Sequence, residues 1–365
     1  MNILIVGEFS GFAKHLKNGF RILGHDVTVV QTGDGWKGLG NSEDIMIRTY
    51  NDVSFCGVRI RGLNRLLAPF IRKNLLKQLE QHTLKPDIII VINYTFLSSN
   101  CFQGGVPITL IGKYIKNGSR LIMSICGIDP ANYYRNPEMF KAIGMKKNRE
   151  NRRHLFLINH SDAIIPTCFG YYDAIYNYCI DKGFRYSHIR HSIPLPITVD
   201  KDCNIAPCEN RKIVIFHGVI RPRSKGTPFI KQAMERIQED YPDRVECFCE
   251  GGLPYDEYVK LFDRVDILID QTYGNGWGIN AAIGAMKGKC VLTCCGKENE
   301  TDMGIETIPF VQIKPDDEQI YNVLKDLILH PQTIDDFKRR SREFVEKYCE
   351  CSIVANRYIQ TLSQE

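Results

Sequence analysis

The chain has 365 residues, about the length of two domains, and 44% of them are apolar, as in soluble globular proteins. No apolar run approaches the roughly 20 residues of a transmembrane helix, and the first residues lack the basic leader and cleavage site of a signal peptide. The net charge of +5 is a small excess without an aromatic-rich basic module, so we expect a cytoplasmic protein that binds no nucleic acid.

The first residues predict a strand, a glycine turn, a helix and a second strand. The strands are expected at residues 3–6 and 27–30, and Gly7 and Gly11 flank the turn. This order is typical of a Rossmann-like domain, but the glycine spacing is not the GxGxxG fingerprint, so no dinucleotide is predicted. His15, one turn into the helix, is either a surface histidine or a residue that points into a cleft between domains.

Apolar stretches at residues 87–92, 120–124 and 163–166 predict strands of a parallel sheet that is buried on both faces. Before them, Pro69 interrupts a helical pattern, so we expect a fresh helix to begin at Phe70. 

Asp129 follows the 120–124 stretch and stands before a proline. Open α/β sheets bind ligands outside the carboxyl ends of their strands, which makes Asp129 a candidate catalytic residue. The alternative is a turn residue before a proline.

A change in amino-acid composition after Pro194 predicts the place where the chain crosses between two domains. Pro194 and Pro196 lie in an extended apolar segment, and residues 200–211 are polar. We therefore expect a first domain at residues 1–195, a linker at 196–211 and a second domain at 212–345.

The second domain begins with a predicted strand at 212–216, followed by Gly218, Arg221 and Lys225 ahead of a helix. Arginine grips a phosphate through two N–H groups and lysine supplies a point charge, so these cations are typical of a phosphate site. 

Two further strands of this domain end in polar or glycine-rich loops. The strand at 245–249 leads to Gly251 and Leu253, and the strand at 267–269 leads to Gln271. After Gln271 come a glycine loop at 273–278, a small-residue helix and the next strand. Such a βαβ unit places open helix amides beside glycines, where an anion can approach the backbone. A crossover without a ligand is the alternative.

The segments that follow these predicted strands resemble the donor-site motifs of GT-B glycosyltransferases of the GT4-like, or group 1, family. Lys225-Gly226 matches the end of the family's G-R-L-x3-K-G segment, and residues 275–291 match E-G-F-G-x4-E-A-M-A-x-G-K-P-V without gaps. Asn275 and Ile283 stand where the family has glutamates. The resemblance spans nearly the whole chain.

The resemblance implies a GT-B architecture: two Rossmann-like domains that face each other across a cleft, with a C-terminal helix at 352–365 crossing back to the first. It implies a glycosyltransferase that moves a sugar from a UDP- or GDP-linked donor to a saccharide or lipid-linked saccharide, in polysaccharide synthesis. It implies retention of anomeric configuration and neither metal ion nor bound cofactor.

The resemblance also assigns residues. Asp129 on the acceptor side and Asn275 on the donor side are the expected catalytic residues. Asn275 and Gln271 are expected to recognise sugar hydroxyls, because neutral amides both donate and accept. The residues expected to bind the donor are Gly11, Gly218, Arg221, Lys225, Gly251, Leu253, Gln271, Gly276, Trp277 and Gly278.

Two other functions stay open. The missing glutamates favour a non-catalytic GT-B protein that binds a sugar nucleotide or a glycan. A nucleotide-sugar 2-epimerase would use two Rossmann-like halves and a diphosphate site of the same kind. 

Two basic segments lie in the first half of the chain: Arg59, Arg61, Arg65, Arg72, Lys73 and Lys77, and Lys141, Lys146, Lys147, Arg149, Arg152 and Arg153. A solvated helix face is the ordinary explanation of each. The functional alternatives are a phosphate-bearing acceptor and peripheral contact with an anionic membrane on its inner face.

None of the 14 cysteines stands in a CxxC pair, and the nearest sets lack zinc-ribbon spacing. We expect buried free thiols in a reducing cytoplasm, with a metal or disulfide role as the alternative.

Overall fold

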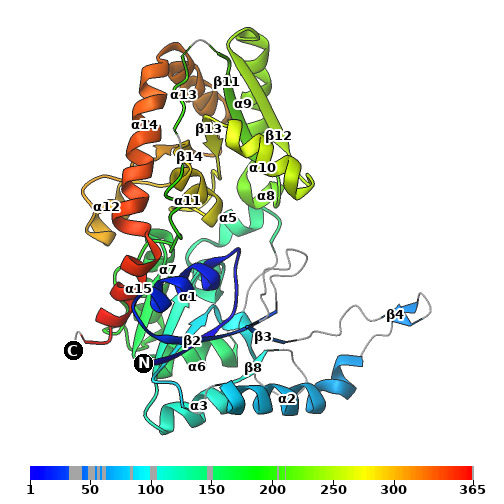
Figure 1. Cartoon of the computed structure of the whole chain (residues 1–365), viewed down its shortest axis with the longest axis vertical. Helices are drawn as coiled ribbons and strands as arrows, with labels where there is room; N and C mark the ends of the chain where they lie inside the picture. Colours follow the sequence, from blue (N-terminus) through cyan, green and yellow to red (C-terminus); the bar gives the residue numbers. More distant parts are fainter. Residues whose placement is uncertain are drawn as a thin grey trace.

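The computed structural model describes residues 1–32, 43–47, 54–55, 58–59, 63–82, 85–98, 105–145, 151–203, 205–209 and 211–363. Two lobes lie one above the other along the long axis, each built around one parallel sheet (Figure 1). The predicted α/β architecture of two Rossmann-like domains is confirmed.

The first sheet has the strand order β10-β9-β6-β1-β2-β3, and its strand pairs are parallel. Its strands are β1 (Asn2–Val6), β2 (Asp26–Gln31), β3 (Ile45–Met46), β6 (Ile88–Ile92), β9 (Arg120–Ile125) and β10 (Ala163–Pro166). Side chains alternate along β1, so that Ile3 and Ile5 enter one apolar cluster while Leu4 and Val6 enter another. The sheet is therefore covered on both faces, as its apolar strands predict.

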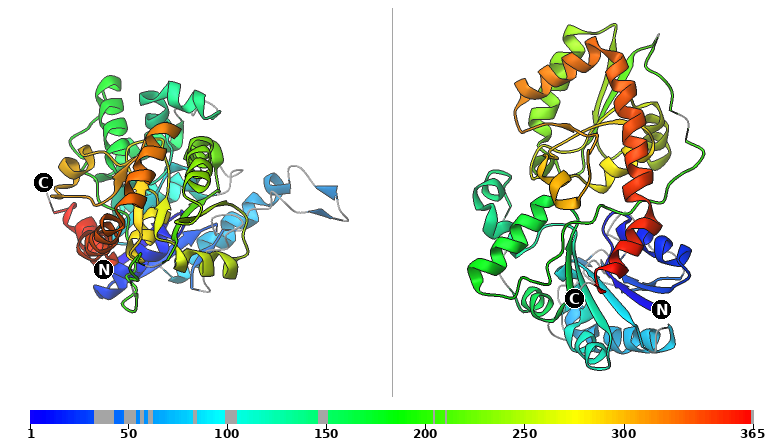
Figure 2. Two further views of the ribbon diagram at one scale, coloured as in Figure 1. Left: turned by 90° about the horizontal axis from the view of Figure 1, so that it is seen from above. Right: turned by 90° about the vertical axis from the view of Figure 1, so that its left-hand side faces the viewer.

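The helices of this domain are α1 (Phe12–Ile22), α2 (Leu63–His82), α3 (Ile108–Lys116), α4 (Pro130–Arg135), α5 (Pro137–Ala142), α6 (Arg152–His160) and α7 (Phe169–Lys182), with a 3-10 turn, η2 (Tyr94–Phe96). Two small strand pairs complete it: β4 (Ser54–Phe55) with β5 (Val58–Arg59), and β7 (Leu97–Ser98) with β8 (Val106–Pro107). The β4–β5 hairpin stands away from both sheets (Figures 1 and 2).

The second sheet is also parallel and has the order β12-β11-β13-β14-β15. Its strands are β11 (Ile213–Gly218), β12 (Val245–Glu250), β13 (Ile267–Ile269), β14 (Cys290–Thr293) and β15 (Val311–Gln312). Its helices are α8 (Pro222–Lys225), α9 (Thr227–Asp240), α10 (Tyr255–Arg264), α11 (Ile279–Met286), α12 (Glu298–Met303), α13 (Asp317–Leu329) and α14 (Pro331–Phe344).

A π-helical turn, η3 (Val345–Cys349), leads from α14 into the last helix, α15 (Cys351–Gln360), which packs against α1 of the first domain (Figure 2). A hydrogen bond of 2.8 Å joins the hydroxyls of Tyr358 and Ser124, and burial raises the pKa of the Tyr358 phenol. Where the chain crosses between domains, Ile197 donates to the main-chain oxygen of Cys349 at 2.7 Å. The last helix is thus bonded to the first domain, and the turn that precedes it is bonded to the crossing segment.

One local expectation is corrected. Helix α2 runs through Pro69 instead of starting anew at Phe70. Pro69 is the seventh of 20 helical residues; it lacks an N–H and removes one backbone hydrogen bond, but the helix continues on both sides of it.

The twelve cysteines that the structure describes are free thiols, and in that part of the chain no group of three metal-binding side chains occurs. Within the same residues, the search for a helix long and apolar enough to cross a membrane finds none.

Candidate functional site

An ion pair between Lys225 and Asp270 lies at the carboxyl ends of the second sheet. Asp270 directly follows β13 and its side chain is fully buried, while the Lys225 side chain is 13% exposed. One carboxylate oxygen accepts from the Lys225 ammonium, and the other accepts from the main-chain N–H of Gly278 at 2.9 Å. Asp270 therefore fixes a cation against the loop that precedes α11. The sequence interpretation missed this residue, because it assigned Asp270 only to the end of a strand.

The Lys225 ammonium lies close to the first residues of α11. Gly278 is the N-cap of α11, and a Cβ built on it would lie 3.6 Å from the Lys225 ammonium nitrogen. The amino end of a helix carries open N–H groups and a partial positive charge, and a nearby ammonium adds a full one. A glycine at this position leaves room for a ligand, so the arrangement suits a phosphate group.

The loop that carries Lys225 is held by close packing against the end of β13. Gly226 has a positive φ of 72°, and a Cβ there would overlap the hydroxyl of Thr272. Thr272 in turn donates its N–H to the main-chain oxygen of Lys225 at 3.1 Å. 

His217, on β11, joins the same two segments. Its Nδ1 bonds the oxygen of Ile269 at 2.8 Å, and its Nε2 bonds the hydroxyl of Thr227 at 2.8 Å. Because a carbonyl can only accept, Nδ1 carries the proton and Nε2 accepts. Burial lowers the pKa of His217, which favours this neutral form.

Gln271 and Asn275 are both engaged in internal hydrogen bonds. The Gln271 side chain accepts from Lys225 at 3.3 Å and donates to the oxygen of Tyr273 at 3.4 Å. The Asn275 side-chain oxygen accepts from the N–H of Gly296 at 2.9 Å and from the amide of Asn299 at 2.7 Å. Their recognition of sugar hydroxyls stays a prediction.

Glu298 supplies a carboxylate beside Asn275, whose amide donates to Glu298 Oε2 at 3.2 Å. Asn275 stands at a position where the resembling family has a glutamate, so an acid from α12 lies next to the substituted position. Ile283, at the second such position, packs its partly buried side chain against a cluster of the second domain and against a cluster that spans both domains. The sequence interpretation did not single out Glu298, because it lies 23 residues beyond Asn275.

The glycine loop at residues 273–278 also contacts the first domain. The first two N–H groups of α7 receive no cap from their own domain. Instead, Phe169 donates to the side-chain oxygen of Asn299 and Gly170 donates to the main-chain oxygen of Asn275, both at 2.9 Å. Gly276 packs so closely against Cys168 that a Cβ would lie 2.5 Å from its sulfur. Burial raises the pKa of the Cys168 thiol to about 12, so this thiol is an apolar contact and not a nucleophile.

Trp277 was expected to bind the donor. Its side chain is 5% exposed and packs edge to face against Phe310 at 5.4 Å and Phe344 at 6.0 Å. The side chain therefore belongs to the core beneath the loop, and a part of Trp277 in donor binding stays a prediction. The motif places an aromatic residue there for packing against α14.

The remaining predicted residues of this domain lie at neighbouring strand ends. Gly218 pairs with Glu250 at the ends of β11 and β12, and Gly251 approaches the main-chain oxygen of Val219 so closely that a Cβ would overlap it. Leu253, two residues further, is half-buried. Their part in donor binding stays a prediction.

Of the two arginines near Lys225, Arg221 is exposed at the N-cap of α8. Arg223 reaches the first domain, where a Cβ on Gly144 would lie 2.7 Å from its Nη1. Desolvation raises the pKa of the Tyr171 phenol, the Asp129 carboxylate acts in the same direction, and Arg221 acts in the opposite direction. Arg221 and Asp129 therefore both act on Tyr171 from opposite domains.

Asp129 itself is buried, with 1% exposure, and caps α4. One carboxylate oxygen accepts from the N–H of Asn132 at 3.0 Å, and the other lies 3.6 Å from Nε2 of the buried His154. The alternative of a turn residue is thus realised, and a further role for Asp129 stays a prediction. 

Gly11 was also expected to bind the donor. Its N–H donates to a carboxylate oxygen of the buried Glu8 at 2.8 Å, and the N–H of Lys14 donates to the other at 3.1 Å. Glu8 thus takes up the main-chain N–H groups of Gly11 and Lys14 at the start of α1, and a part of Gly11 in donor binding stays a prediction. His15 bonds Thr198 in the crossing segment and accepts its N–H at 3.1 Å; burial lowers the pKa of His15 to about 4.

No family model matches the chain, and no curated protein matches its sequence. Solved structures do match. Anabaena Alr3699/HepE in complex with UDP and glucose aligns over 100% of both chains, with 13% identity and a TM-score of 0.62. A glycosyltransferase from Rickettsia africae ESF-5 aligns over 100% of this chain and 97% of its own, with 14% identity and a TM-score of 0.56.

An epimerase matches over the same length. UDP-GlcNAc 2-epimerase from Neisseria meningitidis bound to UDP-GlcNAc aligns over 100% of both chains, with 12% identity and a TM-score of 0.52. At these identities the likeness concerns the fold. The chain therefore has the GT-B fold that these glycosyltransferases and this epimerase share.

Proposed function

We propose that the protein is a glycosyltransferase that transfers a sugar from a nucleoside-diphosphate sugar to a saccharide or lipid-linked saccharide. The observation that carries this proposal is the Lys225 ammonium, which Asp270 holds beside the amino end of α11. This is the place in the second sheet where an open α/β domain binds a phosphate.

The chemistry of such a transfer suits this arrangement. When the bond between the sugar and the diphosphate breaks, its electron pair goes to the phosphate oxygen, and negative charge grows there. A cation and helix N–H groups that are already in place stabilise this charge without reorganisation. Lys225 and the exposed Arg221 are the proposed cations, and the acceptor hydroxyl gives its proton to the departing diphosphate oxygen as its own oxygen bonds the sugar.

The comparisons support a nucleotide sugar as the donor. The Anabaena structures that align with this chain are complexes with UDP and with UDP-glucose. We propose a UDP- or GDP-linked donor, no metal ion, and retention of configuration. Asp200 and Asp202 have the D-x-D spacing of some metal sites, but Asp200 lies outside the candidate site and pairs with Lys287 at 2.9 Å.

The first test is the affinity for nucleoside diphosphates. Lys225→Ala should weaken binding of UDP or GDP about 10-fold or more, because a charge-assisted hydrogen bond contributes roughly 1.5–3 kcal/mol. Binding of the uncharged nucleoside should change much less. Isothermal titration calorimetry measures both. Lys231→Ala, on the exposed face of α9, is the matched control and should leave both affinities unchanged. Equal diphosphate affinity of the wild type and Lys225→Ala would contradict the assignment.

The epimerase alternative is favoured by the alignment with two UDP-GlcNAc 2-epimerase structures. Measuring free UDP distinguishes the two: a glycosyltransferase releases UDP only when an acceptor is present, while an epimerase converts its substrate without an acceptor. A non-catalytic binding protein, favoured by Asn275 and Ile283 at the glutamate positions, would bind the diphosphate and turn over neither substrate.

A further inference from the structure

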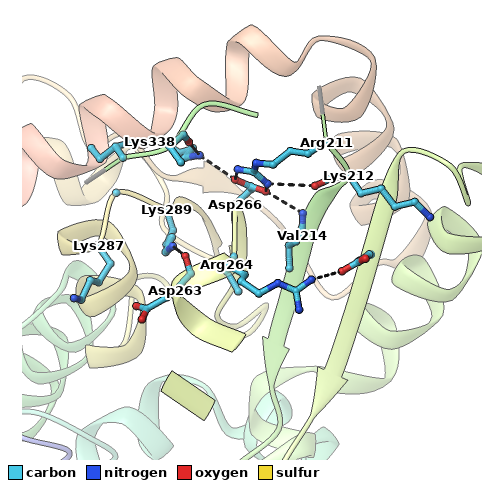
Figure 3. A pocket seen from close by; sticks show the side chains of 14 residues that line it. Arg211, Lys212, Val214, Asp263, Arg264, Asp266, Lys287, Lys289 and Lys338 are labelled. Atoms are coloured by element: carbon cyan, nitrogen blue, oxygen red, sulfur yellow. Dashed lines mark hydrogen bonds and ion pairs between the residues drawn. The ribbon is translucent and has the colours of Figure 1, made fainter. Parts of the chain in front are cut away.

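A cavity of about 380 Å³ opens at the amino ends of the second sheet. Its lining includes Val214 near the start of β11, Asp266 immediately before β13 and Lys289 immediately before β14 (Figure 3). Because the strands are parallel, their amino ends lie at the edge opposite the candidate site, where Lys225 and Gly278 follow the carboxyl ends. The cavity is therefore separate from the proposed donor site.

Cations outnumber acids in the lining. The basic residues that line the cavity are Arg211, Lys212, Arg264, Lys287, Lys289 and Lys338, and the acidic ones are Glu246, Asp263 and Asp266. A surplus of positive charge around a hollow attracts an anion.

The central acid is already shared by two cations. Asp266 is 1% exposed and accepts two hydrogen bonds of 2.6 Å from the guanidinium of Arg211. Its carboxylate also accepts from the N–H of Val214 at 3.0 Å and pairs with the ammonium of the buried Lys338 at 2.9 Å. Lys338 also lies 3.7 Å from the carboxylate of Asp335, so Arg211 and Lys338 face two carboxylates and already have their counter-charges.

Lys289 is the least compensated of the buried cations. It is 6% exposed, and its ammonium donates to the main-chain oxygen of Asp263 at 2.9 Å. Among the described residues no carboxylate forms an ion pair with it, and burial lowers the pKa of Lys289 to about 8, so it is still mostly protonated at pH 7. An ammonium has three donors, and a buried charge without a counter-ion is costly.

The linker forms one wall of the cavity. Ile205 packs against Gly288, where a Cβ would lie 2.5 Å from its side chain, and Ala206 accepts from the ammonium of Lys338. Lys287, at the end of α11, pairs with Asp200 of the linker. Arg264 and Lys287 stand at the carboxyl ends of α10 and α11, where a helix dipole favours cations. That effect does not account for the buried Lys289.

We propose that this cavity binds a small phosphate-bearing anion, with Lys289 as the buried counter-charge and Arg264 at the rim. The volume lies near the lower end of small-molecule pockets, so the expected ligand is closer in size to pyrophosphate or a sugar phosphate than to a nucleotide sugar. Arg264 pairs with Glu246 at 2.6 Å across an exposed edge and can turn toward such a ligand.

The test uses pyrophosphate as the probe in calorimetric titrations of the full chain. Pyrophosphate is also expected at the donor site, so the titrations are done in the Lys225→Ala protein, which should keep one site. Adding Lys289→Met should weaken that site about 10-fold or more, because it removes a charge-assisted contact while keeping the length of the side chain. Arg264→Gln should also weaken pyrophosphate binding, and it leaves the buried interior unchanged because Arg264 lies at the rim. 

Lys231→Gln, on α9 and outside the cavity, changes the net charge equally and should leave the affinity unchanged. Thermal unfolding of each variant shows that it is folded. The proposal is overturned if Lys225→Ala alone abolishes pyrophosphate binding. It is also overturned if Lys289→Met and Arg264→Gln bind pyrophosphate as tightly as their parent, or if Lys231→Gln weakens binding as much as they do.

Discussion

Asn275 connects the glycine loop of the second domain to two other segments. Its side-chain oxygen accepts from Gly296 and Asn299, its amide donates to Glu298, and its main-chain oxygen accepts from Gly170 of the first domain. The second N–H of the amide bonds no described residue. A single N–H thus remains for a sugar hydroxyl, while most of the side chain shapes the loop.

Asn275→Ala should therefore lower the free energy of unfolding by about 1–3 kcal/mol, because the N–H groups of Gly296 and Asn299 lose their acceptor. Urea denaturation measures this. Asn322→Ala is the matched control: its amide bonds Glu318 on an exposed helix face at 3.3 Å, so the change should stay within roughly 0.5 kcal/mol. Unchanged stability of Asn275→Ala together with lost donor affinity would instead make Asn275 a direct ligand of the sugar.

At the scale of elements, the return of α15 to the first domain depends on a small residue in α1. Gly19 lies in the middle of α1, and a Cβ there would overlap the main-chain oxygen of Cys351, at the start of α15. The Glu350 carboxylate caps α15 by accepting from the N–H of Ser352 at 2.9 Å. The backbone of α15 thus approaches α1 at its own capped end.

Gly19→Ala should destabilise the protein by roughly 1–3 kcal/mol, because a close-packed interface cannot accept the added methyl group without moving. Gly112→Ala in α3 is the control, since nothing lies within 4 Å of its Cβ position. There, the better helix propensity of alanine should stabilise by up to about 1 kcal/mol. The two unfolding midpoints should move in opposite directions; a stabilised Gly19→Ala protein would show that α15 is not docked in this way.

At the scale of the whole molecule, the first domain carries an exposed apolar and basic face on α2. Phe70 is 72% exposed, and Lys73 and Lys77 are exposed one and two turns further along the helix. In the second basic segment, the Arg153 side chain is bonded within the first domain, because it donates to the main-chain oxygen of Leu97 at 3.1 Å. Lys146, Lys147, Arg149 and Arg61 lie outside the described residues, as do the side chains of Arg59, Arg65 and Arg72.

We propose that α2 attaches the protein to an anionic membrane, where a lipid-linked acceptor would be found. Each lysine near such a surface contributes roughly 1 kcal/mol, so Lys73→Gln with Lys77→Gln should reduce binding to anionic vesicles about 30-fold. Co-sedimentation at low salt measures it, and the binding should fade as salt rises. Lys231→Gln with Lys260→Gln in the second domain is the charge-matched control. A wild-type protein that stays in the supernatant would rule out this attachment.

The sequence by itself determined the fold and the position of the candidate site. Both depend on local patterns: apolar runs predicted the buried parallel strands, and Lys225 and Gly278 stand next to the strand ends that position them. The positions of β6, β9 and β13 followed from runs of apolar residues alone, because a strand covered on both faces needs such a run.

The tertiary structure decided which of the predicted side chains are free to bind. Glu8 fills the helix start beside Gly11, and Phe310 and Phe344 enclose Trp277. Asp270, which holds Lys225, lies 45 residues from it in the chain. A sequence motif reflects the backbone geometry of a few neighbouring residues. Whether a motif residue is buried, or its N–H groups are already bonded, depends on side chains from distant parts of the chain. Those side chains come together only when the sheet forms and the two domains meet.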